Sequence, residues 1–380
     1  MRRCCAVLIV LVLIAGVLPA AANALEVKAK SALLMDVTTG TVLFEQNAHE
    51  ALAPASVTKV MTLLLVMEAI DSGVMGWQDT VTASEEAASK GGSQIFLKAG
   101  ETMTVEEMVK SVAVSSANDC ACALAEHIAG SESAFVEKMN SRAAELGMQD
   151  TRFVNCTGLD DDPAAKDHKT SAHDIAVMSR ELLKNHPDIK KYTTIWMDTV
   201  RNGQFGLSNT NKMVRFYSGA TGLKTGFTSA AGYCLSASAL REGMELVAVV
   251  MGCESSADRF AACKALLDHG FASYALIMPE LPDVQTVPVK LGTEESVNAV
   301  LGQQGPMLID KAQRKSVTTE VELQPEVAAP VSKGQALGTL TVKSGDQILM
   351  RLPLVAEKPV MKVSWGSLFV KVLKSIFSGA

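Results

Sequence analysis

One unusually apolar segment constrains the fold of this chain more than any other feature. Residues 60–70 are almost all hydrophobic, with Pro54 just upstream and Gly73 just past the end, which predicts a single helix. Apolar residues occupy nearly every position rather than one face, so we expect this helix to be buried on all sides. A chain of 380 residues, 48% of them hydrophobic and 20% charged, can enclose such a helix in a core.

A serine and a lysine stand at the start of that helix. Ser56 and Lys59 are three residues apart, so on a helical turn their side chains share a face. A serine hydroxyl attacks well only when a base removes its proton, and desolvation lowers the pKa of a lysine enough for that role. The S-x-x-K pattern alone is common by chance, so its meaning depends on partners elsewhere in the chain.

A second pair of polar residues lies at a break between two predicted helices. Ser116 is placed to relay a proton between Lys59 and a leaving group, and the Asn118 amide to hold Lys59 and a substrate carbonyl. The alternative is that Asn118 only caps the following helix.

A third motif, Lys224-Thr225-Gly226, ends an extended segment. The lysine offers a positive charge, the threonine a hydroxyl for a carboxylate or carbonyl, and the glycine lets a substrate backbone lie close to the strand edge. The alternative is a β-turn.

Periodicity, caps and turn residues predict the remaining elements. Helices are expected at 104–114, 119–128, 133–146, 171–183 and 256–267, the last ending before Gly270. Extended segments are expected at 31–35, 41–44, 214–224, 232–240 and 244–251, and a loop at 202–211. Beyond residue 275, short β-prone segments separated by turn residues predict a small all-β module.

Both ends of the chain differ from its centre. Residues 1–24 have a charged start, an apolar centre and the small-residue site Ala22-Asn23-Ala24, which predicts a cleaved export signal, with an uncleaved anchor as the alternative. Residues 363–380 place Trp365 and other apolar residues on one helical face and lysines opposite. We expect this segment to lie in a membrane interface, the alternative being that it packs on the β module.

Composition excludes some functions and leaves others open. A net charge of -6 and only 5% aromatic residues argue against nucleic-acid binding. Six cysteines follow the signal segment and suit small core positions, although disulfides remain possible in an exported protein. Cys120-x-Cys122 is too tightly spaced for a usual zinc pair, so we expect no metal.

The three motifs, in this order on a helix, an inter-helix break and a strand, form the motif set of penicillin-binding proteins and class A β-lactamases. The sequence resembles the low-molecular-mass penicillin-binding proteins, the D-alanyl-D-alanine carboxypeptidases of peptidase family S11, over nearly the whole mature chain. Segments 53–56, 115–126, 221–233 and 329–335 carry this resemblance. It implies an α+β fold with an antiparallel sheet flanked by helices. The implied domains are catalytic (25–275), β-rich (276–362) and anchoring (363–380).

The resemblance also implies a mechanism. Ser56 would attack the carbonyl between the two terminal D-alanines of a peptidoglycan stem peptide, Lys59 would take its proton, and Ser116 would pass a proton to the departing D-alanine. Backbone N–H groups of Ser56 and Phe227 would form the oxyanion hole, and Arg259 would bind the terminal carboxylate unless it is a surface arginine. The implied substrate-binding residues are Asn118, Lys224, Thr225, Gly226, Phe227 and Arg259. No cofactor is implied.

Related activities remain as alternatives. Phe227 replaces a histidine found in some family members. The replacement affects the rate of ester hydrolysis only if that side chain, rather than the backbone N–H, takes part in the step. A class A β-lactamase needs a glutamate-bearing loop, and residues 150–162 contain no E-x-x-L-N. A D,D-endopeptidase and a non-catalytic cell-wall binding protein are the other candidates. The expected partners are stem peptides ending in D-Ala-D-Ala, β-lactam antibiotics as inhibitors, and the outer face of the cytoplasmic membrane.

Overall fold

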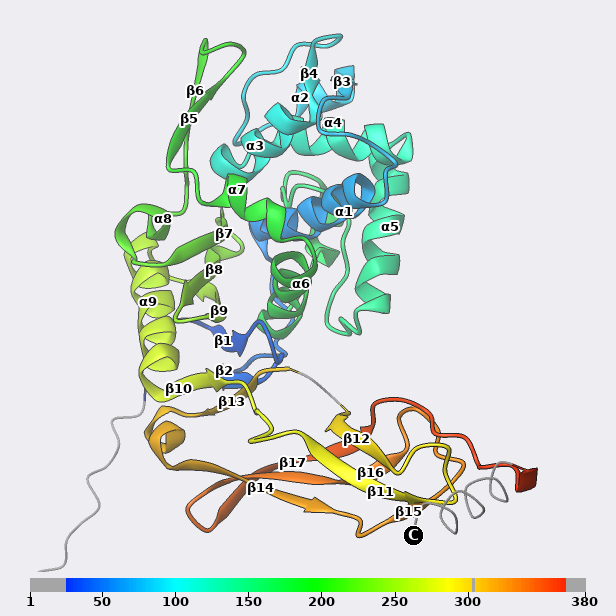
Figure 1. The fold of residues 1–380 in the computed structure, drawn as a ribbon. Helices are drawn as coiled ribbons and strands as arrows, with labels where there is room; N and C mark the ends of the chain where they lie inside the picture. The colour runs from blue at the N-terminus through cyan, green and yellow to red at the C-terminus, as the bar shows by residue number, and fades with distance from the viewer. Residues whose placement is uncertain (1–24, 303–304, 367–380) are drawn as a thin grey trace, which may run out of the picture.

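The computed structural model describes residues 25–302 and 305–366, and its centre is a five-stranded antiparallel sheet (Figure 1). The strands lie in the order β2-β1-β9-β8-β7, so β7 is an edge strand. Their bounds are β1 (Ser31–Asp36), β2 (Val42–Gln46), β7 (Ala220–Thr228), β8 (Gly232–Arg241) and β9 (Met244–Cys253). The extended segment expected at 214–224 is partly wrong, because Met213–Phe216 forms the short helix α8 before β7 begins.

Helices cover both faces of this sheet, which confirms the expected α+β fold. Leu33 on β1 packs in the core that contains helix α1 (Lys59–Asp71), whereas its neighbour Leu34 packs with α9 (Ser256–Ser273) on the opposite face. This alternation is the two-residue period of a strand buried on both sides. No residue of α1 before Asp71 is exposed, so the expected all-round burial of this helix is confirmed.

The segment between β2 and β7 forms a helical lobe above the sheet (Figure 1). Thr104 caps the third helix by accepting a hydrogen bond from the N–H of Glu107, as the capping pattern predicts. The elements of the lobe are η1 (Ala55–Thr58), α1, β3 (Thr80–Thr82), α2 (Glu85–Ser89), β4 (Thr102–Thr104), α3 (Val105–Ser115), α4 (Asn118–Ala129), α5 (Glu132–Glu145), η2 (Pro163–Asp167), α6 (Ala172–Asn185), η3 (Pro187–Ile189) and α7 (Lys190–Thr193).

Two further expectations from the sequence are wrong. The segment 202–211 is not all loop, because β5 (Met197–Val200) and β6 (Phe205–Ser208) pair as a hairpin. Helix α9 does not end before Gly270 but continues to Ser273. A Cβ at Gly270 would lie 2.5 Å from a side-chain carbon of Leu246, so this glycine permits close helix–sheet packing and does not end the helix.

The C-terminal part of the described chain is all β, as expected. A six-stranded sheet has the order β14-β16-β17-β12-β11-β15, and a two-stranded sheet joins β10 to β13. The bounds are β10 (Tyr274–Ile277), β11 (Gln285–Lys290), β12 (Ser296–Leu301), β13 (Met307–Asp310), η4 (Lys311–Ser316), β14 (Val317–Leu323), β15 (Val327–Ala328), β16 (Ala336–Ser344) and β17 (Gln347–Ala356).

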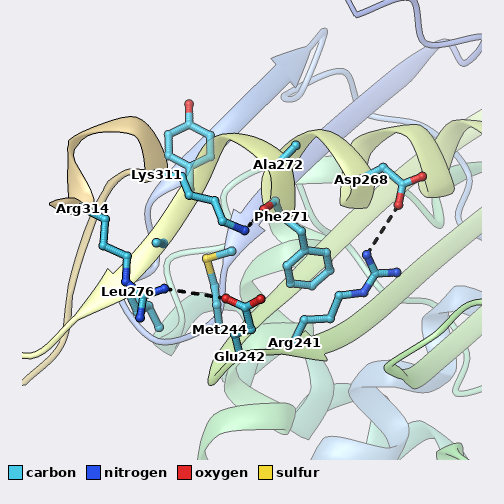
Figure 2. A pocket seen from close by; sticks show the side chains of 11 residues that line it. Arg241, Glu242, Met244, Asp268, Phe271, Ala272, Leu276, Lys311 and Arg314 are labelled. Atoms are coloured by element: carbon cyan, nitrogen blue, oxygen red, sulfur yellow. Dashed lines mark hydrogen bonds and ion pairs between the residues drawn. The ribbon is translucent and has the colours of Figure 1, made fainter.

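Charged side chains line a cavity where the two parts of the chain meet (Figure 2). Lys311 of η4 donates a hydrogen bond to the carbonyl of Phe271 at 3.0 Å, and Arg314 lies 3.7 Å from a carboxylate oxygen of Glu242. The Arg241 guanidinium carbon lies 4.7 Å from the centroid of the Phe271 ring. These contacts connect the β8–β9 turn and α9 to the β-rich part.

The predicted export signal, residues 1–24, lies outside the described residues, as does most of the predicted membrane helix. Trp365, at the start of that segment, is 89% exposed. Within the described part of the chain, no helix has the length and apolarity needed to cross a membrane. The domain ranges given above stay predictions.

Candidate active site

Ser56 and Lys59 form a direct hydrogen-bonded pair at the start of α1. Ser56 lies in the 3-10 turn η1, whose three residues per turn bring it over Lys59. The Lys59 ammonium donates to the Ser56 hydroxyl oxygen at 3.0 Å and to the carbonyl oxygen of Thr157 at 2.8 Å. Its side chain has no exposed surface, and this burial lowers the pKa of Lys59 to about 7. A substantial fraction of the lysine is therefore neutral near neutral pH.

Ser116 and Asn118 occupy the break between α3 and α4. Ser116 has left-handed backbone angles (φ 63°, ψ 28°), which end α3. Its hydroxyl oxygen and the Asn118 side-chain oxygen are buried and have no hydrogen-bond partner among the described residues. Asn118 does not cap α4, because that position is Ala117, and its amide donates to the carbonyl of Gly91 at 2.7 Å. Unpaired buried oxygens cost roughly 1–3 kcal/mol each, so they mark a place for a ligand.

Lys224, Thr225 and Gly226 lie within the edge strand β7, so the β-turn alternative is wrong. The Lys224 ammonium is buried and donates to the Thr225 carbonyl at 2.9 Å. Burial, with the nearby positive charges of Lys59 and Arg259, holds the pKa of Lys224 well below its ordinary value. A Cβ at Gly226 would lie 2.6 Å from the Pro54 carbonyl oxygen and 3.1 Å from the Ser56 nitrogen. The glycine therefore lets β7 approach the backbone of the nucleophile.

Thr210 connects the second and third motifs. Its N–H donates to the carbonyl of Val114, two residues before Ser116, at 3.2 Å. Its hydroxyl oxygen accepts a hydrogen bond from the Thr225 hydroxyl at 2.7 Å. The end of α3 and the K-T-G strand thus lie side by side.

Phe227 lies near the end of β7, Arg259 reaches that strand from α9, and the two side chains differ in exposure. Phe227 is 52% exposed, and its ring centroid lies 4.3 Å from that of Tyr233. Arg259 is only 8% exposed, so it is not a surface arginine. One of its terminal nitrogens donates to the Gly226 carbonyl at 3.0 Å, while its Nε is buried without a partner among the described residues. Arg259 therefore contacts the backbone of β7 from α9.

The sequence analysis missed several residues that hold the nucleophile in place. The backbone N–H of Val154 donates to Nδ1 of His168, so the ring proton is on Nε2, 2.8 Å from the Thr58 hydroxyl oxygen. Thr58 in turn donates to the Ala55 carbonyl at 2.8 Å. Burial lowers the pKa of His168 to about 4, so it is neutral near neutral pH. Thr58 lies inside the S-x-x-K motif, whereas Val154 and His168 come from loops without periodicity, which left only the glycine at position 158 as a local signal of a special backbone.

Comparisons with known proteins define first the class and then the family. The chain is similar to penicillin binding protein 5 from Haemophilus influenzae, with a TM-score of 0.78, 30% identity and coverage of 89% of this chain and 98% of that one. It is also similar to the ampicillin-bound form of penicillin-binding protein D2 from Listeria monocytogenes, with a TM-score of 0.57, 31% identity and coverage of 65% and 99%. The fold is therefore that of the penicillin-binding proteins.

The family pattern described as D-alanyl-D-alanine carboxypeptidase, Peptidase S11, matches residues 19–255, and that of the penicillin-binding protein 5 C-terminal domain matches residues 282–362. The chain is 42% identical over 344 residues to the D-alanyl-D-alanine carboxypeptidase DacF of Bacillus subtilis (strain 168), covering 89% of this chain and 87% of the relative. The chain belongs to the peptidase S11 family of D-alanyl-D-alanine carboxypeptidases and is a hydrolase.

Proposed function

We propose that this chain removes the terminal D-alanine from peptidoglycan stem peptides through an ester on Ser56. The observation that carries the proposal is the Lys59 amine, fully buried, 3.0 Å from the Ser56 hydroxyl oxygen, with a pKa lowered to about 7. A neutral amine at this distance accepts the hydroxyl proton as the oxygen attacks the carbonyl carbon.

The chemistry then proceeds in two balanced steps. In the first, the bond from the Ser56 oxygen to the carbonyl carbon forms and the bond to the nitrogen of the last D-alanine breaks. Ser116 passes the proton from Lys59 to that nitrogen, so free D-alanine leaves. In the second, the oxygen of a water molecule bonds to the ester carbonyl carbon and the bond from that carbon to the Ser56 oxygen breaks. One hydrogen of the water goes to the Ser56 oxygen, and the shortened peptide leaves with a new terminal carboxyl group. No step requires a metal or a cofactor, because hydroxyl, amine and backbone N–H groups provide the nucleophile, the base and the oxyanion donors.

The edge strand β7 provides the binding surface for the substrate. An extended peptide adds to a free strand edge through backbone hydrogen bonds. The negative charge of a terminal carboxylate would be attracted by the Arg259 guanidinium and would favour the charged form of Lys224, whose pKa burial and the nearby cations otherwise lower. Thr225 offers a hydroxyl to the same carboxylate. The N–H groups of Ser56 and Phe227 are proposed as the oxyanion hole, and Asn118 as the donor to a substrate carbonyl.

β-Lactam antibiotics are proposed to acylate the same serine. The solved relative from Listeria monocytogenes carries ampicillin, which supports this extension. Because β-lactam acylation forms the same ester bond to a serine, it depends on the same base and oxyanion donors as the peptide reaction.

Export and membrane attachment complete the proposal. The apolar segment within residues 1–24 supports export, and the pattern of residues 363–380 supports a helix lying on the outer face of the cytoplasmic membrane. Fractionation of cells producing the full chain, compared with a chain that ends at residue 362, tests this part. Recovery of both proteins in the soluble fraction would contradict membrane attachment.

Release of D-alanine from a synthetic stem pentapeptide ending in D-Ala-D-Ala tests the enzymatic proposal. Mass spectrometry should show the loss of one D-alanine with the parent protein and none with Ser56→Ala. A fluorescent penicillin should label the parent stably and Ser56→Ala not at all. Rapid penicillin turnover without peptide hydrolysis would instead indicate a β-lactamase, and cleavage of cross-linked dimers alone would indicate an endopeptidase.

A further inference from the structure

A partly buried ion pair lies behind the active site, in the helical lobe. The Lys90 ammonium lies 2.7 Å from one carboxylate oxygen of Glu132, and the two side chains are only 17% and 16% exposed. Lys90 also lies 2.7 Å from a carboxylate oxygen of Glu86, which is far more exposed. Lys90 follows helix α2, and Glu132 is the first residue of α5, so the pair joins two elements far apart in sequence.

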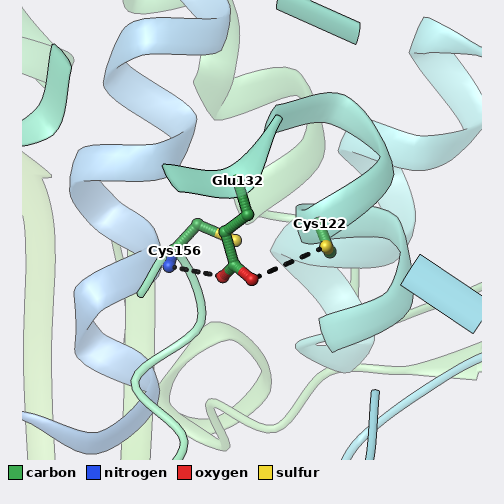
Figure 3. Close-up of side chains that lie close together, drawn as sticks. All are labelled: Cys122, Glu132 and Cys156. Carbon is green, nitrogen blue, oxygen red and sulfur yellow. Dashed lines mark hydrogen bonds between the residues drawn. The ribbon is translucent and has the colours of Figure 1, made fainter. Parts of the chain in front are cut away.

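The second oxygen of Glu132 holds the loop that supports Lys59. It accepts a hydrogen bond from the backbone N–H of Cys156 at 3.0 Å, and Figure 3 shows the carboxylate directed at this nitrogen. The next residue, Thr157, provides the carbonyl oxygen that accepts from the Lys59 ammonium at 2.8 Å. Glu132 is therefore one residue away from the group that orients the proposed base.

Lys90 is likewise one residue away from a group that holds a residue of the site, in this case Asn118. The residue after it, Gly91, provides the carbonyl that accepts from the Asn118 side-chain amide at 2.7 Å. Two residues further on, the carbonyl of Ser93 accepts from the Asn118 backbone N–H at 2.7 Å. The side-chain oxygen of Asn118 remains without a partner among the described residues, and the loop 91–93 fixes where it points.

We propose that the Lys90–Glu132 ion pair is a clamp that joins the loop holding Asn118 to the loop holding Lys59, so that the binding group and the base keep a fixed separation. Lys90 and Glu132 are positioning residues, since neither touches the reacting atoms. The inference rests on the proposed function and extends it to residues outside the three motifs.

The electrostatics agree with a charged pair. Burial alone would raise the pKa of Glu132, yet the hydrogen bonds from Lys90 and Cys156 hold that pKa below its ordinary value. Burial likewise opposes the charge of Lys90, but its bonds to Glu132 and Glu86 more than offset this and raise its pKa. Both groups are therefore ionised at neutral pH. Removing either one leaves a partly buried charge unpaired, which is far more disruptive than losing an exposed pair.

The side chains around Glu132 do not favour a metal ion. Among the described residues, ligand atoms of Cys122, Glu132 and Cys156 lie within 4.8 Å of one another (Figure 3). However, both oxygens of Glu132 already have partners, and one of these partners is the ammonium of Lys90. A divalent cation would have to displace this positive charge. Burial also raises the pKa of Cys156 well above its ordinary value, which disfavours the thiolate that a metal needs.

Penicillin acylation measured at saturating and sub-saturating concentrations tests the clamp, because it separates the binding constant from the acylation rate constant. Lys90→Met and Glu132→Gln should each lower the acylation rate constant by about 10-fold, since small displacements of a base are costly. The double variant should be no slower than the slower single variant, because both remove one interaction. Lys90→Arg, which keeps the charge, should restore the rate constant to within about twofold of the parent.

Glu181→Gln is the matched control. Glu181 pairs with Arg142 at 2.8 Å and is 19% exposed, so it resembles Glu132 in burial but touches neither loop. It should change the rate constant by less than about twofold. All variants are compared at a temperature at which melting curves show them folded.

Parental rate constants in Lys90→Met and Glu132→Gln, with Ser56→Ala unlabelled, would overturn the clamp alone. An equal loss in Glu181→Gln would also overturn it, since general destabilisation would then explain the effect. Stoichiometric binding of zinc at Cys122 and Cys156 by the purified protein would replace the clamp by a metal site. Labelling of Ser56→Ala would instead overturn the proposed function, and the clamp with it.

Discussion

A terminal nitrogen of Arg259 lies 3.0 Å from the carbonyl oxygen of Gly226, one residue before the backbone N–H proposed for the oxyanion hole. The arginine reaches this carbonyl from α9, and its guanidinium carbon lies 5.3 Å from the centroid of the Tyr233 ring. The sequence suggested a direct contact with the substrate carboxylate. The structure adds a second contact, in which Arg259 holds the backbone of β7, the strand proposed to bind substrate.

Replacing this arginine should therefore slow acylation even by ligands that depend little on a contact between their carboxylate and Arg259. Arg259→Ala removes a charged hydrogen bond, which contributes roughly 1.5–3 kcal/mol, so the acylation efficiency should fall about 10-fold to 100-fold. Arg259→Lys should retain part of the rate because it keeps the positive charge. It should not restore the full rate, because a lysine lacks the forked hydrogen-bond donors of the guanidinium group. Stopped-flow labelling with a fluorescent penicillin measures both. An unchanged rate in Arg259→Ala would show that the Gly226 contact does not position the strand.

The lowered pKa of Lys59 predicts a pH profile. The amine is neutral above about pH 7 and charged below it, whereas an ordinary lysine would stay charged up to about 10.5. Acylation efficiency should level off above pH 7 and fall about tenfold for each pH unit well below it, since only the neutral amine accepts the serine proton. Efficiency that keeps rising beyond pH 9 would mean that Lys59 is an ordinary charged lysine.

Lys59→Arg provides the control for that profile. An arginine stays charged at every accessible pH, so it cannot act as the base. The variant should lose roughly 10²–10⁴-fold in acylation rate and show no inflection near pH 7. Penicillin labelling between pH 5 and pH 9 measures both the acylation rate and its dependence on pH, and melting curves confirm that the variant is folded.

The buried His168 predicts how stability depends on pH. Its folded-state pKa is about 4 against an ordinary 6.5, so the unfolded chain takes up a proton first as the pH falls. The stabilisation is fully present above pH 6.5 and is lost between pH 6.5 and about 4, by at most ~3 kcal/mol. Urea unfolding of the parent and of His168→Gln across this range should show a smaller pH dependence in the variant. If the free energy of unfolding depended on pH equally in the two proteins, the lowered pKa of His168 would not account for the pH dependence.

The sequence predicted the elements whose signals are local. The buried helix α1, the strands β8 and β9, and the three motifs follow from periodicity and short patterns, and Ser56 does lie beside Lys59. The hairpin β5–β6 has a local signal, because Asn202-Gly203 is a strong turn pattern, and Asn202 and Gly203 have the positive φ angles that such a turn needs. The prediction of a loop at 202–211 is nevertheless wrong, because residues 205–208 pair with residues 197–200.

The remaining parts of the site depend on contacts between distant loops, which no local pattern reveals. Thr157 contacts Lys59 across 98 positions, and His168 contacts Thr58 across 110. Glu132, the less exposed of the two carboxylate partners of Lys90, is 42 residues away from it. These contacts form only once the sheet and helices bring the loops together, and a single sequence carries no record of such pairings.

Gly158 offers a direct test of one such contact. It has a φ of +80°, and a Cβ there would lie 1.9 Å from the Ala55 carbonyl oxygen and 2.7 Å from the Thr58 hydroxyl oxygen. Gly158→Ala must therefore push the loop away from the nucleophile turn, which should lower stability by more than about 3 kcal/mol and lower acylation about 100-fold or more. Gly203→Ala is the matched control, because its φ of +86° imposes the same backbone strain with nothing within 4 Å of the added carbon. It should cost only about 1 kcal/mol and leave acylation unchanged. Equal effects of the two substitutions in melting and labelling experiments would mean that backbone strain, rather than the contact with Ala55, accounts for the need for glycine at position 158.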